Sequence, residues 1–168
     1  REAAREIEEV TETLAGFVRE GKIRSIGYSE IAPSSLRRAA AVHPIAAVQS
    51  EYSLQTRSPE LGLVQTCAEL GTALVAFSPV GRGLLTDRPH AQARIQEIAF
   101  LKSNPRFREP NHSANLTKNA EFRALAADMG LPAAALAIAW VCARGVHVLP
   151  IPGTRSVEHL QECVTGAE

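Results

Sequence analysis

Helical and extended patterns of apolar residues alternate along the whole chain. The first helical pattern stops at Gly21, a residue that commonly follows the end of a helix. Between later helical patterns, short runs predict four strands: 23–28, 46–49, 73–77 and 146–151, the last of which begins as a β-branched run. The helical patterns that lie between and after them cover 33–42, 58–71, 118–129 and 132–143. Strict alternation without a hairpin signal predicts an α/β protein with a parallel sheet and right-handed crossovers.

The alternation is interrupted between about residues 84 and 117. This stretch is rich in Pro, Asn and Arg and shows no sustained apolar period, so the sequence predicts a long loop there. Connections of this length in compact domains are usually functional or mobile. We therefore expect a mobile loop that folds over a bound ligand.

Composition narrows the class of protein. The chain has 168 residues, enough for one domain with a core, and 18 basic residues balance 18 acidic ones. Charge balance predicts no nucleic-acid partner, and no apolar run approaches the ~20 residues of a membrane span. The three cysteines lack metal-type spacing and suggest reduced thiols in a cytoplasmic protein. The first residues are charged and helical rather than signal-like, and the missing initial methionine suggests that a segment precedes them.

Polar residues follow the carboxyl end of each predicted strand, where parallel sheets bind ligands. Ser29 and Gln49 follow the first two strands and could hydrogen-bond a planar carboxamide, while Tyr52 could stack on a flat ring. Taken singly, each has an alternative interpretation as loop chemistry or as a satisfied polar group of the core.

The last two strand ends suggest phosphate binding. Residues 78–83 include two glycines that leave room for a phosphate beside the backbone, and Arg82 offers a counter-charge. Residues 153–156 combine a glycine turn, two hydroxyls and an arginine before a predicted helix, whose amino-terminal N–H groups attract anions. On spacing alone, an ordinary capped connection between strand and helix explains residues 153–156 equally well.

Four segments, in order, resemble the aldo-keto reductase family: 21–30, 48–54, 76–83 and 150–155. The resemblance implies a (β/α)8 barrel of TIM type, of which residues 1–168 would form about four βα units, the carboxyl-terminal half. It also implies NADPH bound in extended form along the rim, without the dinucleotide glycine fingerprint. The barrel's inner face would include residues around Val48, Val75 and Val148.

The resemblance also implies roles for individual residues, all in cofactor binding. Those expected at the nicotinamide are Ser29, Gln49 and Tyr52. Those expected at the pyrophosphate are Ser78, Pro79, Val80, Gly81 and Arg82. Those expected at the adenosine 2′-phosphate and adenine are Gly153, Thr154, Arg155, Ser156, His159 and Glu162. The family often has asparagine at position 30, where this chain has glutamate.

No catalytic residue is expected in this chain, because the family's Asp-Tyr-Lys-His tetrad lies on the first four strands of the barrel. The resemblance implies an NADP-dependent oxidoreductase that reduces aldehydes and ketones, with this chain supplying the cofactor-binding half. The alternatives are a non-catalytic nucleotide-binding or assembly subunit and an inactive truncation. A half-barrel leaves open sheet edges, so we expect it to need either the other half or self-association.

Overall fold

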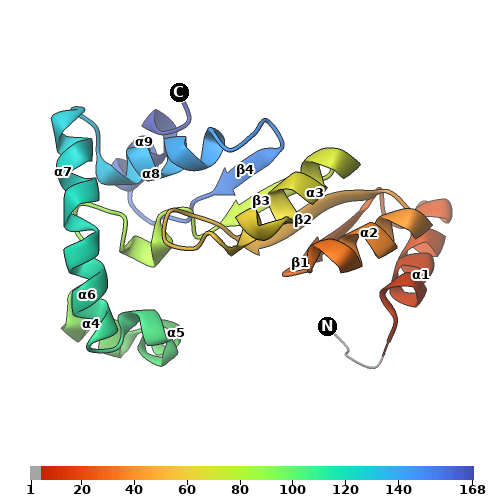
Figure 1. The fold of residues 1–168 in the computed structure, drawn as a ribbon, viewed down its shortest axis with the longest axis horizontal. Helices are drawn as coiled ribbons and strands as arrows, with labels where there is room; N and C mark the ends of the chain where they lie inside the picture. The colour runs from red at the N-terminus through yellow and green to blue at the C-terminus, as the bar shows by residue number, and fades with distance from the viewer. Residues whose placement is uncertain (1–4) are drawn as a thin grey trace. The chain divides into compact units, whose positions relative to one another are not determined.

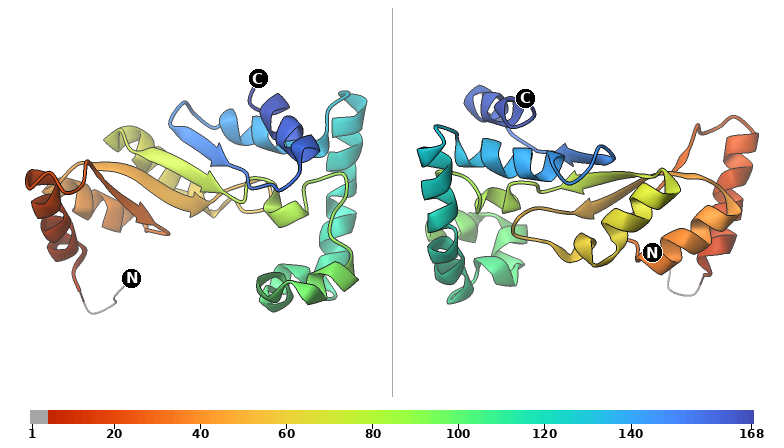
Figure 2. Two further views of the ribbon diagram at one scale, coloured as in Figure 1. Left: turned by 180° about the vertical axis from the view of Figure 1, so that it is seen from behind. Right: turned by 45° about the horizontal axis from the view of Figure 1, so that its top comes forward.

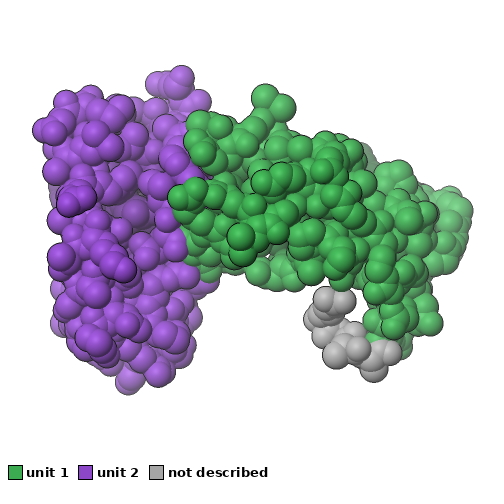
Figure 3. Space-filling model, viewed as in Figure 1, with its two compact units in different colours: residues 1–52, 56–77, 142–151 green, residues 53–55, 78–141, 152–168 purple. Residues whose placement is uncertain are grey.

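The computed structural model describes residues 5–168, which form two compact units. Of the described residues, unit 1 contains 5–52, 56–77 and 142–151, and unit 2 contains 53–55, 78–141 and 152–168 (Figure 3). Unit 1 carries the sheet and the helices that cover it, whereas unit 2 is helical apart from its loops. Each unit is described by itself.

The sheet of unit 1 has four parallel strands in the order β1-β2-β3-β4 (Figure 1). Their bounds are β1 Ile26–Ser29, β2 Ile45–Glu51, β3 Ala73–Phe77 and β4 Val148–Ile151. All four predicted strands are present, and strands that are consecutive in the chain are neighbours in the sheet. The predicted α/β class and the parallel sheet are confirmed.

Helices cover one face of this sheet. They are α1 Ile7–Arg19, α2 Pro33–Val42, the 3-10 turn η1 Ser58–Leu61 and α3 Leu63–Leu70. Helices α2 and α3 lie side by side along the strands (Figures 1 and 2). The helix predicted over 58–71 is divided at Gly62, whose φ of 128° is open to glycine but not to an ordinary helical residue.

Strand register assigns residues to the two faces of the sheet. Val48, Leu74 and Val148 form one row across three strands, and all three side chains are buried on the side of the helices. The expectation that Val48 and Val148 face the barrel centre is therefore wrong. The next row consists of Gln49, Val75 and Leu149, and it lies on the opposite face, where Leu149 is 50% exposed.

Unit 2 is built from short helices. They are η2 Gly81–Gly83, α4 Gln92–Glu97, α5 Ala99–Ser103, η3 Pro105–Phe107, α6 Asn111–Lys118, α7 Ala120–Asp128, α8 Ala133–Cys142 and α9 Val157–Thr165. The end of α8 belongs to unit 1. The N–H of Ala133 at the start of α8 donates to Asp87 Oδ2 over 3.0 Å, which satisfies one of the donors left open at a helix start.

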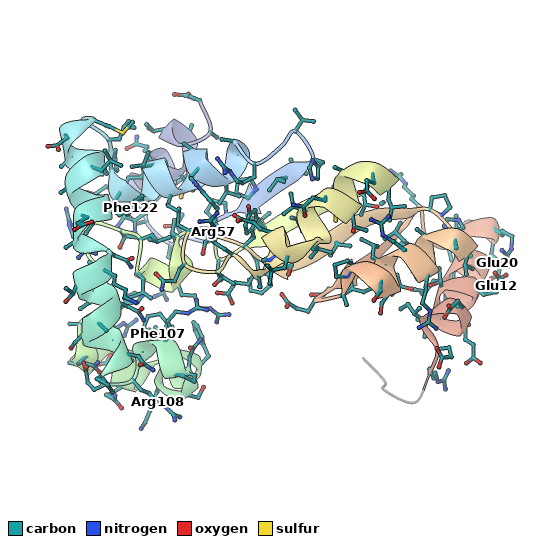
Figure 4. All side chains as sticks on the ribbon, in the orientation of Figure 1. Glu12, Glu20, Arg57, Phe107, Arg108 and Phe122 are labelled. Atoms are coloured by element: carbon teal, nitrogen blue, oxygen red, sulfur yellow. The ribbon has the colours of Figure 1, made fainter. Side chains whose placement is uncertain are left out.

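Residues 84–117 are not the long irregular loop that the sequence predicts. Helices α4, α5 and α6 occupy much of this segment, and Leu84, Ile95, Leu101 and Phe107 form an apolar core there (Phe107 is labelled in Figure 4). Helices of five or six residues are too short to show a period in the sequence, which is why they were missed. Movement of this segment on cofactor binding stays a prediction.

Within the described residues, no single helix is both long and apolar enough to cross a bilayer. Helical segments 111–128 and 133–142 reach the length and apolarity of a membrane span only when they are counted together, and they are bent by 92° relative to each other.

Candidate cofactor site

The nicotinamide end of the predicted site begins with two polar residues on neighbouring strands. Ser29 on β1 and Gln49 on β2 are direct partners in the parallel ladder, and both are exposed. Val48 and Ser50, on either side of Gln49, are buried against the helices, so Gln49 faces the open side. Their pairing supplies an amide donor, an amide acceptor and a hydroxyl at one point on the open face.

Glu30 fixes the end of β1 beside β2. It has a left-handed backbone with φ 51°, and its N–H donates to the Gln49 carbonyl over 2.9 Å. Its Oε1 accepts from the Glu51 N–H at 2.9 Å and from Ser50 Oγ at 3.2 Å. Glu30 and Ser50 also line a pocket of about 250 Å³ at the start of α2. Glu30 therefore helps to hold Ser29 against Gln49.

Tyr52 does not offer a stacking surface in this structure, which corrects its predicted role. Its ring is 0% exposed, and its hydroxyl donates to Glu60 Oε1 over 2.9 Å. Burial raises the pKa of the phenol well above its usual value, and the hydrogen bond to Glu60 adds to this effect. Arg57 also donates to Glu60, so Tyr52 belongs to a local packing cluster.

An aromatic residue that sequence reasoning missed lies on the open face instead. Phe77 ends β3, pairs in register with Glu51 and Ile151, and is two residues beyond Val75, so it shares the face of Gln49. It is half-buried. The strand position before it, Ala76, is buried on the helix side, so alternation along the strand places Phe77 on the opposite face.

Neither of the chain's two tyrosines presents a hydroxyl on the open face. The hydroxyl of Tyr28 lies 2.7 Å from Thr11 Oγ1 in α1, on the side of the helices, and Tyr52 is bonded to Glu60.

The segment predicted to hold pyrophosphate is a strained loop of unit 2. Ser78, Gly81, Arg82 and Gly83 all have φ values between 52° and 92°, a region that suits glycine best. Hydrogen bonds within the loop hold this path: the Gly81 N–H donates to the Ser78 carbonyl and the Gly83 N–H to the Val80 carbonyl. Pro79, between them, is buried. The loop is thus preformed rather than free to adopt many conformations.

The two glycines of this loop are required by space as well as by φ. A Cβ on Gly81 would lie 3.3 Å from Gln55 Cβ, and a Cβ on Gly83 would lie 3.0 Å from His90 Nε2. The imidazole of His90 therefore packs directly on the backbone of loop 78–83.

His90 makes the stability of this region depend on pH. Burial lowers the pKa of its imidazole below 6.5, and Coulombic interactions with Arg94 and His112 lower it further. Below about pH 6.5, His90 takes up a proton more readily in the unfolded chain than in the native chain. The free energy of unfolding therefore falls as pH falls. We expect urea unfolding to show a lower free energy of unfolding at pH 5 than at pH 8. The variant His90→Gln should reduce this difference. A pH profile that His90→Gln leaves unchanged, like that of the control His43→Gln, would refute the assignment.

Residues 153–156 form a capped helix start, as predicted. Ser156 is the N-cap of α9, and its Oγ accepts from the His159 N–H. Thr154 Oγ1 accepts from the Ser156 N–H over 3.1 Å, while Gly153 and Arg155 are exposed. The N–H groups of Ser156 and His159 are thus used within the cap, whereas the exposed Arg155 could pair with a phosphate.

The remaining predicted residues lie on α9. His159 is exposed in its first turn, and Glu162 is half-buried one turn later. Glu158, between the cap and His159, is 3.5 Å from Arg88, so a second arginine reaches the first turn of this helix. Sequence reasoning missed Arg88 because it lies inside the segment interpreted as a loop.

Comparisons with known proteins agree on one family. The model of the Aldo/keto reductase family matches residues 2–167. The chain is 38% identical over 159 residues to "Aldo-keto reductase yakc [NADP(+)]" of Schizosaccharomyces pombe, covering 93% of this chain and 47% of that protein. It is 40% identical over 156 residues to "Probable aldo-keto reductase 1" of Glycine max, covering 93% and 45%. The chain thus spans about half the length of these curated relatives.

Solved structures show the same relationship. The glycerol dehydrogenase AKR11B4 from Gluconobacter oxydans superposes with a TM-score of 0.81 at 25% identity, covering 99% of this chain and 50% of that one. The thermostable aldo-keto reductase Tm1743 gives a TM-score of 0.71 at 27% identity, covering 98% and 50%.

Proposed function

The chain belongs to the aldo/keto reductase family, and we propose that it supplies the cofactor-binding half of an NADPH-dependent carbonyl reductase. One observation supports this most strongly: Ser29 and Gln49 are paired in register on the open face of the sheet. A nicotinamide carboxamide has one donor and one acceptor group, and an exposed glutamine beside a serine can satisfy both. Phe77, on the same face, would replace Tyr52 as the aromatic surface for the ring.

Unit 2 would hold the charged parts of the cofactor. The preformed loop 78–83 presents a backbone without side chains at Gly81 and Gly83, and Arg82 lies between them. The start of α9 offers Thr154, Arg155 and Ser156 for the 2′-phosphate, and the name of the S. pombe relative specifies NADP(+). His159 and Glu162 would lie toward adenine.

When bound, the cofactor supplies a hydride for an aldehyde or ketone. The residues of this chain bind and orient it, and none of them is assigned the proton transfer. Lacking a tyrosine hydroxyl on the open face, the chain would depend for its proton donor on residues outside those described. A small carbonyl compound is the proposed substrate class, and the other half of the barrel or a second copy is the proposed partner.

The same tyrosine geometry favours a second candidate function. A chain that holds NADPH but places no general acid beside it would act as a nucleotide-binding or assembly subunit. NADPH binding without turnover in the fully assembled protein separates this candidate from the reductase.

Gln49 gives the proposal a direct test. Gln49→Ala is expected to weaken NADPH about tenfold, because a lost hydrogen bond to the carboxamide is worth ~1–1.5 kcal/mol. It should leave 2′-phospho-ADP-ribose, which lacks nicotinamide, unaffected. Calorimetric titration of both ligands measures the difference, with the surface variant Gln65→Ala as control. Equal weakening of both ligands, or no change in either, would remove Gln49 from the nicotinamide site.

A further inference from the structure

The conformation of Arg82 is unusual for a residue that carries a side chain. Its φ of 57° and ψ of 39° lie in the left-handed region, between two glycines that also have positive φ. A side chain at such a position is unfavourable unless the surrounding structure holds it there. The guanidinium of Arg82 is held in part by an aromatic ring: its Cζ lies 5.6 Å from the centroid of Phe100.

Phe100 stands on a helix that is anchored beside it. In α5, Leu101 is 1% exposed and belongs to the apolar core with Ile95 and Phe107, while Phe100 is 57% exposed. The core thus fixes the backbone of α5, and Phe100 presents its ring outward to Arg82. Its contact with the guanidinium gives this exposed aromatic residue a defined neighbour.

The same core holds the phosphate loop itself. Leu84 directly follows Gly83 and packs with Ile95 and Leu101, and the Leu85 N–H donates to the Val80 carbonyl over 3.1 Å. Both loop 78–83 and α5 are therefore attached to this apolar core, the loop through Leu84 and α5 through Leu101. A change in α5 would reach Arg82 through the side chain of Phe100. It would reach the backbone of loop 78–83 through Leu84.

From these contacts we propose that Phe100 is a positioning residue for the cofactor: its ring orients the Arg82 guanidinium toward the pyrophosphate held by loop 78–83. The inference rests on the proposed function. The ring attracts the guanidinium through its π electrons and has no N or O atom of its own, so it restricts Arg82 without competing with a phosphate for hydrogen bonds. Helix α5 thereby becomes part of the phosphate site, although it would not touch the phosphate.

A double-mutant cycle in the NADPH-binding protein tests this role. An exposed cation–π contact corresponds to about a two- to fivefold change in affinity. Phe100→Leu is therefore expected to weaken NADPH and NADH by the same factor, since both carry the pyrophosphate, and Phe100→Trp to restore both. In an Arg82→Met background, Phe100→Leu should have no further effect. Leu125→Ala, which truncates a similarly exposed residue on α7, serves as the control.

Each other outcome overturns the inference. If Phe100→Leu leaves affinity unchanged, weakens it equally in the Arg82→Met background, or is not rescued by tryptophan, Phe100 does not act through Arg82. Those results would leave the proposed function intact, because the parent protein would still bind NADPH. If the parent protein binds neither cofactor, the proposed function and this inference fail together.

Discussion

The isolated 168-residue chain is expected to self-associate and to leave aldehydes unreduced. The open face of its sheet carries Val75, Phe77, Leu149 and Ile151, of which Leu149 is 50% and Ile151 45% exposed. Strands β1 and β4 are the edges of the described sheet and present backbone groups that invite pairing. A second copy can cover both the apolar face and the edges, so sedimentation should show a dimer or larger species.

Activity should be absent for a separate reason. Both tyrosine hydroxyls are engaged on the side of the helices or in a buried cluster. Neither hydroxyl can then supply the ~10²–10⁴-fold contribution of a positioned general acid. An NADPH-oxidation assay with an aromatic aldehyde measures this, with a full-length relative as positive control. A compact monomer that reduces the aldehyde at the relative's rate would contradict both expectations.

Arg155 is expected to control the choice between NADPH and NADH. It is exposed beside the capped start of α9, where a 2′-phosphate would accept hydrogen bonds from its N–H groups. Arg155→Ala removes a charge-assisted hydrogen bond worth ~1.5–3 kcal/mol and should weaken NADPH at least about tenfold while NADH changes little. Titration of both cofactors, against Arg94→Ala on α4 as control, provides the measurement. If Arg155→Ala lowers the affinities for NADPH and NADH by the same factor, Arg155 lies outside the 2′-phosphate site.

The sequence predicts the strands well here because each is a short run that lies between two helical patterns. It does not predict which face each residue occupies: Val48 and Val148 look the same as Val75 in such runs, and only the register separates them. Tyr52 was misassigned for the same reason. It follows the strand in sequence, but its ring turns into a cluster with Glu60 that no local pattern reveals.

The helix start at 153–156 was predictable, because its cap depends on neighbouring residues: Ser156 bonds the N–H three residues later. Residues 84–117 were not, because their order comes from a core shared by distant positions such as Leu84 and Phe107. The contact between Phe100 and Arg82 depends on that same core, so it is visible only in the folded chain.

Calorimetric titration of the chain with NADPH and NADH tests the central claim most directly. The account predicts saturable binding of both cofactors, with NADPH the tighter of the two because of the exposed arginine and hydroxyls at the start of α9. The account would be contradicted if NADPH or NADH showed no saturable binding to this chain under conditions in which a full-length relative binds both.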